Sequence, residues 1–501
     1  MRDITLDISR LFGRMLKGRL PTGVDRVTQA YLAHYRPRAF LRWGRWSRVL
    51  SRALSEEALE LLLAPSFDPG PGDFRGGSFS RGGAENAESF LEMTEGHGAA
   101  VPDPEFQRGN GGFQGDGFRS KALRIIARAI ASGEPASAEI AGSLFLNTGH
   151  SGLERRDYIQ GLRARGFRPV FFIHDLIPIT HPEYGRPGEA DRHRVRMTHA
   201  LEAGAGLIAN SEATLVDLKR FATEAGLRVP PALVALLAPG TEPVAPRPSG
   251  DRPSGDRQNE GPASSMVSIP SIQSIQSLGD RQPDGLHGPY GLHGRPQILS
   301  VPQAARVPQA ARPIAEPYFV MLGTVEPRKN HVFLLQLWRR WVEKLGAATP
   351  KLVLIGQRGW ECENAVDLLE RCPALRGAVI ELGRCSDSAL GAYLQHAQAL
   401  LFPSFAEGYG MPLVEALAQG TPVIAGDLPV YREFAGEIPD YLDPMDGPGW
   451  IRALEDYAAP AGVLRAAQVS RMRGFHPPTW ADHFAKVDPF LANLAPERLP
   501  A

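Results

Sequence analysis

The sequence is poor in cysteine and has no long apolar run. Its three cysteines, Cys362, Cys372 and Cys385, form no C-x-x-C pair, so neither a disulfide framework nor a zinc cage is expected, and a reducing compartment fits best. No uninterrupted apolar stretch approaches the roughly 20 residues that span a bilayer. Residues 1–11 alternate charged and apolar side chains, unlike a signal peptide. We therefore expect a cytoplasmic protein, free or peripheral at the inner face of the membrane.

An excess of charge of one sign is also missing. Lys and Arg total 55, and Asp and Glu total 55, so the chain lacks the general positive charge that holds nucleic acid. The sequence contains no Asp-x-Asp motif, the pattern that would bind a diphosphate through a metal ion. We therefore expect no metal site, no cofactor and no nucleic-acid partner.

The composition that is present is that of a globular protein. Hydrophobic residues make up 43% and charged residues 22% of the 501 residues, which predicts about two domains. Two stretches depart from this pattern. Residues 66–118 are Gly-rich without a sustained period and predict a flexible insertion, and residues 242–316, with the near-tandem copies RPSGDRPSGDRQ, SIQSIQS and VPQAARVPQAAR, predict a low-complexity linker.

Around these stretches, short apolar strands alternate with amphipathic helices. This pattern predicts α/β domains in which a parallel sheet is covered on both faces. In the first domain we expect strands at 169–173 and 206–209 and helices at 192–203 and 212–225. In the second we expect strands at 318–322, 352–355, 379–382, 399–402 and 422–425. The predicted units are an N-terminal Rossmann-like domain at 1–241, a C-terminal Rossmann-like domain at 317–478, and a helix at 479–501 that packs back towards the first domain.

One basic segment has two interpretations. Arginines recur at helical spacing beside Trp43 and Trp46, at positions 38, 42, 45, 48 and 52. They predict either a basic amphipathic helix on a membrane surface or two short strands joined by a turn at Gly44.

The most specific motif is PSFAEGYGMPLVEALAQGT at residues 403–421. A strand leads into a glycine-bearing loop, and a helix begins where Pro412 occupies the first turn. The glycines let the backbone approach a ligand, and the helix N-terminus offers free N–H groups to phosphate or sugar oxygens. Two carboxylates eight residues apart can face one pocket and accept hydrogen bonds from a sugar diol. The candidate donor-binding residues here are Glu407, Gly408, Tyr409, Gly410, Met411 and Glu415.

A second motif is LGTVEPRKN at residues 322–330. A strand feeds Gly323, and the loop then presents Arg328 and Lys329 just before a helix that Asn330 is expected to cap. Adjacent cations at a helix N-terminus suit a diphosphate, since Arg can contact two oxygens and Lys acts as a point charge. Glu326 either orients Arg328 or faces solvent.

The N-terminal domain presents a histidine at a strand end. In FFIHDLIPITHP, residues 171–182, the strand delivers His174 and Asp175 to its carboxyl end, where open α/β sheets bind ligands. Asp175 either orients the histidine or caps the following turn. After the next strand, Ser211 is expected to be an N-cap first and an acceptor-side contact second.

A glycine-bearing loop is predicted near the N-terminus. The sequence LPTGVDRV occupies residues 20–27, after an apolar first strand. Gly23 would allow the backbone to approach a ligand closely, while Arg26 faces either a ligand or solvent.

Together these motifs resemble the GT-B glycosyltransferases with an E-x7-E motif, group four of the usual sequence classification and the family of glycosyl transferases group 1. The resemblance covers both structured regions. It implies that the domain at 1–241 lies on the acceptor side, with Gly23 at the acceptor and Arg26 facing either the acceptor or solvent, and that the domain at 317–478 binds the nucleotide sugar. It implies a GT-B fold, with two Rossmann-like, doubly wound parallel-sheet domains facing a cleft, and retention of anomeric configuration. It also implies that Glu407 lies at the donor hexose, Glu415 at the nucleotide ribose, Arg328 and Lys329 at the diphosphate, and His174 at the transferred sugar.

The expected function is therefore transfer of a hexose from a nucleotide-sugar donor to a saccharide or lipid-linked acceptor in bacterial surface polysaccharide synthesis. The catalytic set would be His174, Glu407, Arg328 and Lys329. Two alternatives remain open: a nucleotide-sugar epimerase or phosphorylase on the same fold, and a non-catalytic scaffold that binds a sugar nucleotide. A scaffold would have no need for the histidine.

Overall fold

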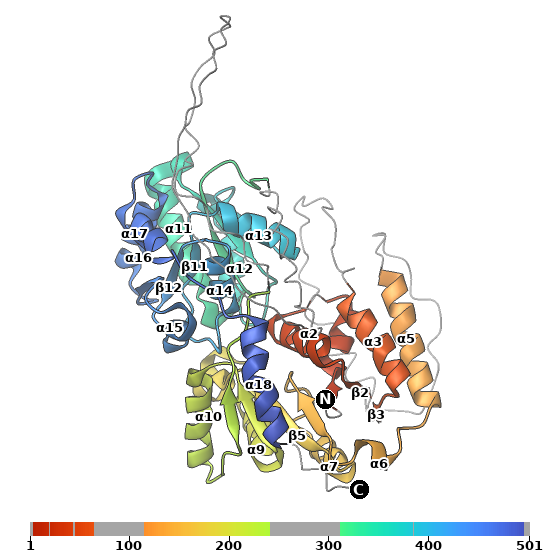
Figure 1. Ribbon diagram of the computed structural model, residues 1–501. Coiled ribbons are helices and arrows are strands. Elements are labelled where there is room, and N and C mark those ends of the chain that lie inside the picture. The colour runs from red at the N-terminus through yellow and green to blue at the C-terminus, as the bar shows by residue number, and fades with distance from the viewer. Residues whose placement is uncertain are drawn as a thin grey trace, which may run out of the picture. The chain divides into compact units, whose positions relative to one another are not determined.

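The computed structural model describes residues 4–19, 21–43, 46–64, 115–240, 311–383 and 385–494 (Figure 1). Most of the predicted insertion at 66–118 and of the predicted linker at 242–316 lies outside these residues. Helix α5 (Gly115–Ala131) begins inside the predicted insertion. The chain before and after the linker forms one compact unit.

The N-terminal part forms a seven-stranded sheet in the order β3-β2-β1-β4-β5-β6-β7. Neighbouring strands are parallel, except that β2 and β3 pair antiparallel. Strands of three or four residues show no period, so the sequence pattern identifies some of them, such as β6, and not others: β4 and β7 are not among the predicted strands. The strands are β1 (Ile4–Asp7), β2 (Arg38–Trp43), β3 (Trp46–Val49), β4 (Leu144–Asn147), β5 (Arg168–Ile173), β6 (Gly206–Ala209) and β7 (Ala232–Val234).

The C-terminal part forms a six-stranded parallel sheet in the order β10-β9-β8-β11-β12-β13. Strands β8 and β10 begin and end at the predicted residues, and the edge strand β13 is not predicted. The strands are β8 (Tyr318–Leu322), β9 (Lys351–Ile355), β10 (Val379–Leu382), β11 (Leu400–Phe402), β12 (Val423–Gly426) and β13 (Asp440–Leu442).

Helices connect the parallel strands. Those of the N-terminal part, besides α5, are α1 (Ser9–Leu16), α2 (Gly23–Tyr35), α3 (Arg52–Leu63), α6 (Ser137–Ile140), α7 (Arg156–Ala164), α8 (Ile177–Thr180), α9 (Glu189–Ala203) and α10 (Glu212–Glu224). Those of the C-terminal part are α11 (His331–Leu345), α12 (Glu363–Arg371), α13 (Asp387–His396), α14 (Met411–Ala418), α15 (Pro429–Ala435), α16 (Gly447–Ala458), α17 (Val463–Arg471) and α18 (Trp480–Leu494). Short 3-10 turns are η3 (Pro182–Tyr184), η4 (Pro327–Lys329), η5 (Gly346–Ala348) and η6 (Pro373–Leu375).

Both sheets are buried on both faces. Along β5, Val170 and Phe172 belong to one apolar cluster, whereas Phe171 and Ile173 belong to another, because successive strand side chains point to opposite faces. Strand β8 alternates in the same way between two clusters of the C-terminal sheet. This two-sided burial is typical of parallel sheets and confirms the predicted α/β class.

The basic segment forms strands. Phe40 pairs with Val49 and Trp43 with Trp46 across the antiparallel β2–β3 ladder, so the arginine spacing does not mark a membrane-surface helix. Phe40 and Val49 are buried beside the sheet, which favours the extended conformation over a helix that would expose them.

Helix α18 packs on the N-terminal sheet although it follows the C-terminal sheet in the chain (Figure 1). Its buried Phe484, Val487 and Leu491 join the apolar cluster that contains Tyr31 of α2. Nε2 of His483 lies 3.0 Å from the Tyr31 hydroxyl. The chain therefore crosses between the two sheets a second time, after the linker.

Candidate active site

The two C-terminal motifs meet in one buried ionic cluster. The Glu407 carboxylate, 6% exposed, accepts from Arg328 at 2.8 Å through Oε2, and its Oε1 contacts the Lys329 ammonium. Ser404 donates its hydroxyl to the same Oε1 at 2.8 Å. The loop after β8 and the loop after β11 meet here because β8 and β11 are neighbours in the sheet.

A second carboxylate completes the cluster. Glu326 accepts from Arg328 at 2.7 Å, which decides between the two predicted roles of Glu326: it orients the arginine. Arg328 also donates to the Ala406 carbonyl at 2.9 Å. Two cations thus face two carboxylates, so the cluster is close to neutral before any ligand binds.

The electrostatic balance sets the protonation states. Burial opposes ionisation of Glu407, but Arg328 and Lys329 outweigh it and hold the pKa of this carboxyl at about 2. Burial lowers the pKa of Lys329, and Glu407 counters that effect. Burial raises the pKa of Glu326 against the pull of Arg328. Glu407 therefore stays ionised at every physiological pH.

Gly323 provides the space for the lysine. Its φ of 147° lies in the region that favours glycine, and a Cβ there would lie 3.4 Å from Cε of Lys329. Asn330 does precede α11, but its side chain makes no cap hydrogen bond. It donates instead to the Pro444 carbonyl at 2.9 Å, so the predicted cap is wrong: the left-handed φ of 63° directs the amide towards the β13–α16 connection.

The Gly408 loop lies against the histidine strand end. A Cβ at Gly408 would overlap the His174 carbonyl oxygen and lie 2.8 Å from Cβ of Asp175. The Gly408 carbonyl accepts from Ser211 at 3.1 Å and from Thr214 at 3.2 Å. The structure therefore brings the donor loop and the histidine loop together, and Gly408 is required by this protein contact.

His174 is buried and held in one tautomer. Its Nε2 lies 2.7 Å from the Thr148 carbonyl, which can only accept, so Nε2 carries the proton and Nδ1 is left as an acceptor. Burial lowers the pKa of His174, which keeps the ring neutral. Such a ring can accept a hydrogen bond from a sugar hydroxyl.

The sequence reasoning missed His150. Its ring lies 5.3 Å from that of His174 and 5.7 Å from that of His193, between centroids. Burial, together with these two histidines, places the pKa of His150 well below its usual range. His150 follows β4 by three residues, and β4 is not among the predicted strands. The sequence pattern therefore did not place this histidine at a strand end.

The other two N-terminal candidates cap turns. Asp175 accepts from the Ile177 amide at 3.1 Å, which is the capping role, although its charge also raises the pKa of His174. Ser211 accepts from the Thr214 amide at 3.1 Å, so it is the predicted N-cap of α10. An acceptor contact for either residue stays a prediction.

Glu415 has partners that the sequence did not indicate. Its carboxylate is buried, and Oε1 lies 3.5 Å from Nη1 of Arg26 and accepts from the Gly240 amide at 3.2 Å. Arg26 also contacts Asp387 at 2.5 Å. Arg26 was expected to face the acceptor or solvent. It binds the C-terminal carboxylates instead, because the α2 N-terminus lies beside the start of α14, where a Cβ on Gly23 would be 3.5 Å from Met411.

Two residues of the donor loop have structural neighbours. The Tyr409 side chain is buried in the core of the N-terminal sheet, and its hydroxyl donates to the Leu237 carbonyl at 2.7 Å. Gly410 has a φ of 101°, and a Cβ there would lie 2.7 Å from the Tyr431 ring. A donor contact at these positions would have to use the backbone.

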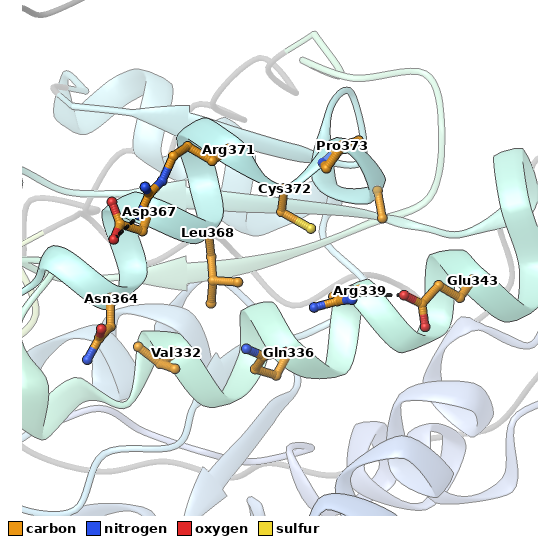
Figure 2. Close-up of a pocket in the computed structure, with 11 residues that line it drawn as sticks. Val332, Gln336, Arg339, Glu343, Asn364, Asp367, Leu368, Arg371, Cys372 and Pro373 are labelled. Carbon is orange, nitrogen blue, oxygen red and sulfur yellow. Dashed lines mark hydrogen bonds and ion pairs between the residues drawn. The ribbon is translucent and has the colours of Figure 1, made fainter.

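A groove of about 730 Å³ lies elsewhere, between α11, α12 and η6 (Figure 2). Ion pairs Arg339–Glu343, at 3.1 Å, and Arg371–Asp367 line it. None of the motif residues contributes to its lining, so this groove is separate from the cluster around Glu407.

The described residues contain neither a candidate metal site nor a candidate membrane-spanning helix. No group of three His, Cys, Asp or Glu side chains is arranged to hold a metal ion in the part of the chain that is described. Among the helices of these same residues, none is both long and apolar enough to cross a membrane. The expected lack of a cofactor stays a prediction.

Comparison with known proteins agrees with this geometry. Residues 306–437 match the model of the family described as "Glycosyl transferases group 1", and this stretch contains Arg328, Lys329, Glu407 and Glu415. This part of the chain is therefore similar to the group 1 glycosyl transferases. The match agrees with the resemblance inferred from the motifs.

The relatives and the fold point the same way. The chain is 34% identical over 149 residues to the serotype-specific mannosyltransferase WbdA of Escherichia coli, covering 29% of this chain and 18% of the relative. It is 35% identical over 129 residues to O-antigen chain mannosyltransferase B of Escherichia coli, covering 26% and 33%. The chain thus spans less than a fifth of the length of WbdA.

The whole fold is similar to a solved structure. Sucrose-phosphate synthase from Thermosynechococcus elongatus superposes with a TM-score of 0.52 at 15% identity, covering 99% of both chains. At this identity the likeness establishes the fold alone. The chain has the predicted GT-B architecture of two α/β domains built on parallel sheets.

Proposed function

We propose that this protein is a glycosyltransferase that moves a mannosyl residue from a nucleotide-sugar donor to a saccharide acceptor in the synthesis of a bacterial surface polysaccharide. The single observation that carries the proposal is the buried cluster of Arg328, Lys329 and Glu407, whose loop lies against His174. The mannosyl specificity rests on the two relatives from Escherichia coli, both of which are mannosyltransferases.

The charges of the cluster suit a departing nucleoside diphosphate. Arg328 and Lys329 are fixed before the reaction by Glu326 and Glu407, so they need little reorganisation when negative charge develops on the leaving oxygen. Glu407, held ionised, accepts hydrogen bonds from the donor hexose. Nδ1 of His174 accepts from a hydroxyl of the same sugar.

We further propose that the reaction retains anomeric configuration, with departure and attack on the same face of the sugar, and needs no metal. The family resemblance supports retention. The acceptor is proposed to be attached to a lipid carrier, with the protein peripheral at the inner membrane face.

A donor panel tests the function. UDP-, GDP- and ADP-linked mannose, glucose and galactose would each be incubated with a mannose-terminated oligosaccharide, and release of nucleoside diphosphate and the extended product would be measured. We expect acceptor-dependent release from one mannose donor, and NMR of the product should show the donor's anomeric configuration. A new sugar isomer formed without acceptor would identify an epimerase instead, and calorimetric donor binding without turnover on any acceptor would identify a scaffold.

A further inference from the structure

Glu415 is held on one oxygen only. Oε1 receives the Gly240 amide at 3.2 Å and lies 3.5 Å from Nη1 of Arg26. Its other oxygen, Oε2, has no protein hydrogen-bond partner among the described residues. The two donors come from α2 and from the end of the N-terminal part, whereas Glu415 lies on α14 of the C-terminal part.

The three groups fit so closely that a side chain at position 240 would displace the Arg26 guanidinium. A Cβ there would overlap Nη1 of Arg26 and lie 2.9 Å from Oε1 of Glu415. The guanidinium is also restrained at its other end, where Nη2 contacts Asp387 at 2.5 Å. The orientation of the Glu415 carboxylate is therefore fixed by groups from outside its own sheet.

We propose that Arg26 and the Gly240 amide are positioning groups for Glu415: they fix Oε1 so that Oε2 is presented to the ribose diol of the nucleotide-sugar donor. This inference rests on the proposed function of the same site. Donor affinity then depends on α2 and on the chain that enters the linker. A carboxylate that is already fixed loses less side-chain freedom on binding the ribose diol than a mobile carboxylate would.

The charged surroundings of Glu415 give a second signature. Burial raises the pKa of Glu415, Arg26 and the Gly240 amide lower it, and Asp387 raises it. Removal of Arg26 therefore moves the protonation of Glu415 to higher pH. A protonated carboxyl presents a weaker acceptor, so the rise of donor KM in acid should begin at a higher pH in an Arg26 variant.

The experiment measures donor KM and kcat of the full chain for Arg26→Ala, Arg26→Lys and Gly240→Ala. For Arg26→Ala we expect donor KM to rise about 10-fold, the loss of one charged hydrogen bond, with little change in kcat. Arg26→Lys should recover part of the effect. Gly240→Ala should raise donor KM as Arg26→Ala does, because its Cβ displaces the guanidinium. Arg128→Ala, which breaks an exposed pair with Glu57, is the matched control.

Glu415→Gln separates the inference from the proposed function. If Glu415→Gln raises donor KM while Arg26→Ala and Gly240→Ala leave both KM and its pH profile unchanged, the positioning role is wrong and the donor site stands. If Glu415→Gln also leaves donor KM unchanged, the ribose assignment falls, and the positioning role falls with it. A loss of stability and kcat without a change in donor KM would indicate a merely structural role.

Discussion

Glu433 caps the helix that begins at Glu212, although Glu433 lies on a helix of the C-terminal part and Glu212 on a helix of the N-terminal part. The Glu433 carboxylate on α15 accepts from the backbone amides of Glu212 at 2.7 Å and Ala213 at 2.8 Å. These amides have no partner within α10 because they lie in its first turn. One side chain of the C-terminal part thereby completes a helix of the N-terminal part.

Replacing Glu433 by Ala should weaken this connection. A lost N-terminal cap costs about 1 kcal/mol, and half-burial keeps the electrostatic part small. We expect the free energy of unfolding, measured by urea denaturation, to fall by about 1 kcal/mol in Glu433→Ala and by less in Glu433→Gln. Glu437→Ala, an exposed neighbour, serves as the control, and equal stability of all three variants would contradict the capping role.

Gly408→Ala should separate the donor loop from the histidine. The added Cβ meets the His174 backbone and Cβ of Asp175, which cannot yield as a flexible side chain would. We expect kcat to fall at least about 10-fold, since displacement of catalytic groups by about 1 Å has such effects. Gly391→Ala places a Cβ in open space within α13 and should leave kcat unchanged; comparable losses in both variants would argue against the contact.

Lys329→Met should expose the interdependence of the ionic cluster. Loss of the buried ammonium leaves Glu407 undercompensated, and breaking a buried pair costs about 3 kcal/mol. We expect urea denaturation to show a loss of this size and donor turnover to disappear. Combining Lys329→Met with Glu407→Gln should recover stability without activity, giving a coupling energy above about 1 kcal/mol in the double-mutant cycle. Additive effects of the two substitutions would mean that the pair does not interact.

His483 should make stability depend on pH. Burial lowers its pKa to about 4, whereas the unfolded side chain titrates near 6.5. The unfolded state therefore takes up a proton first as pH falls. The contribution of the neutral His483 ring to the free energy of unfolding is fully present above about pH 7 and is lost as pH falls from 6.5 towards 4. Between pH 7 and pH 5 this residue should account for about 2 kcal/mol.

The measurement is urea denaturation at both pH values in the parent chain and in His483→Asn. The variant should be less stable at pH 7, since its contacts with Tyr31 and Leu236 are altered, and should lose less stability on acidification. An unchanged pH dependence in the variant would assign the effect to the other buried histidines.

The amino-acid pattern alone predicts the α/β class, most strands of the two sheets, the strand-loop-helix around Glu407 and the cationic loop of Arg328 and Lys329. These features are local: apolar strands, glycines and the helix-starting proline at Pro412 act within a few residues, so spacing and residue type are enough to predict them. Apolar runs of three or four residues show no period, so short strands are predicted unevenly: β6 and β11 are among the predicted strands, whereas β4 and β13 are not.

Which side chains of the candidate site contact one another depends on the folded chain and not on local sequence patterns. Arg26 and Glu415 are far apart in the chain, and their contact depends on how α2 lies beside α14, which no local pattern records. The same holds for Gly408 against His174, where a glycine expected to face a ligand is required by a neighbouring backbone. Side-chain partners across two sheets follow from packing of the whole chain, and that packing is a non-local property.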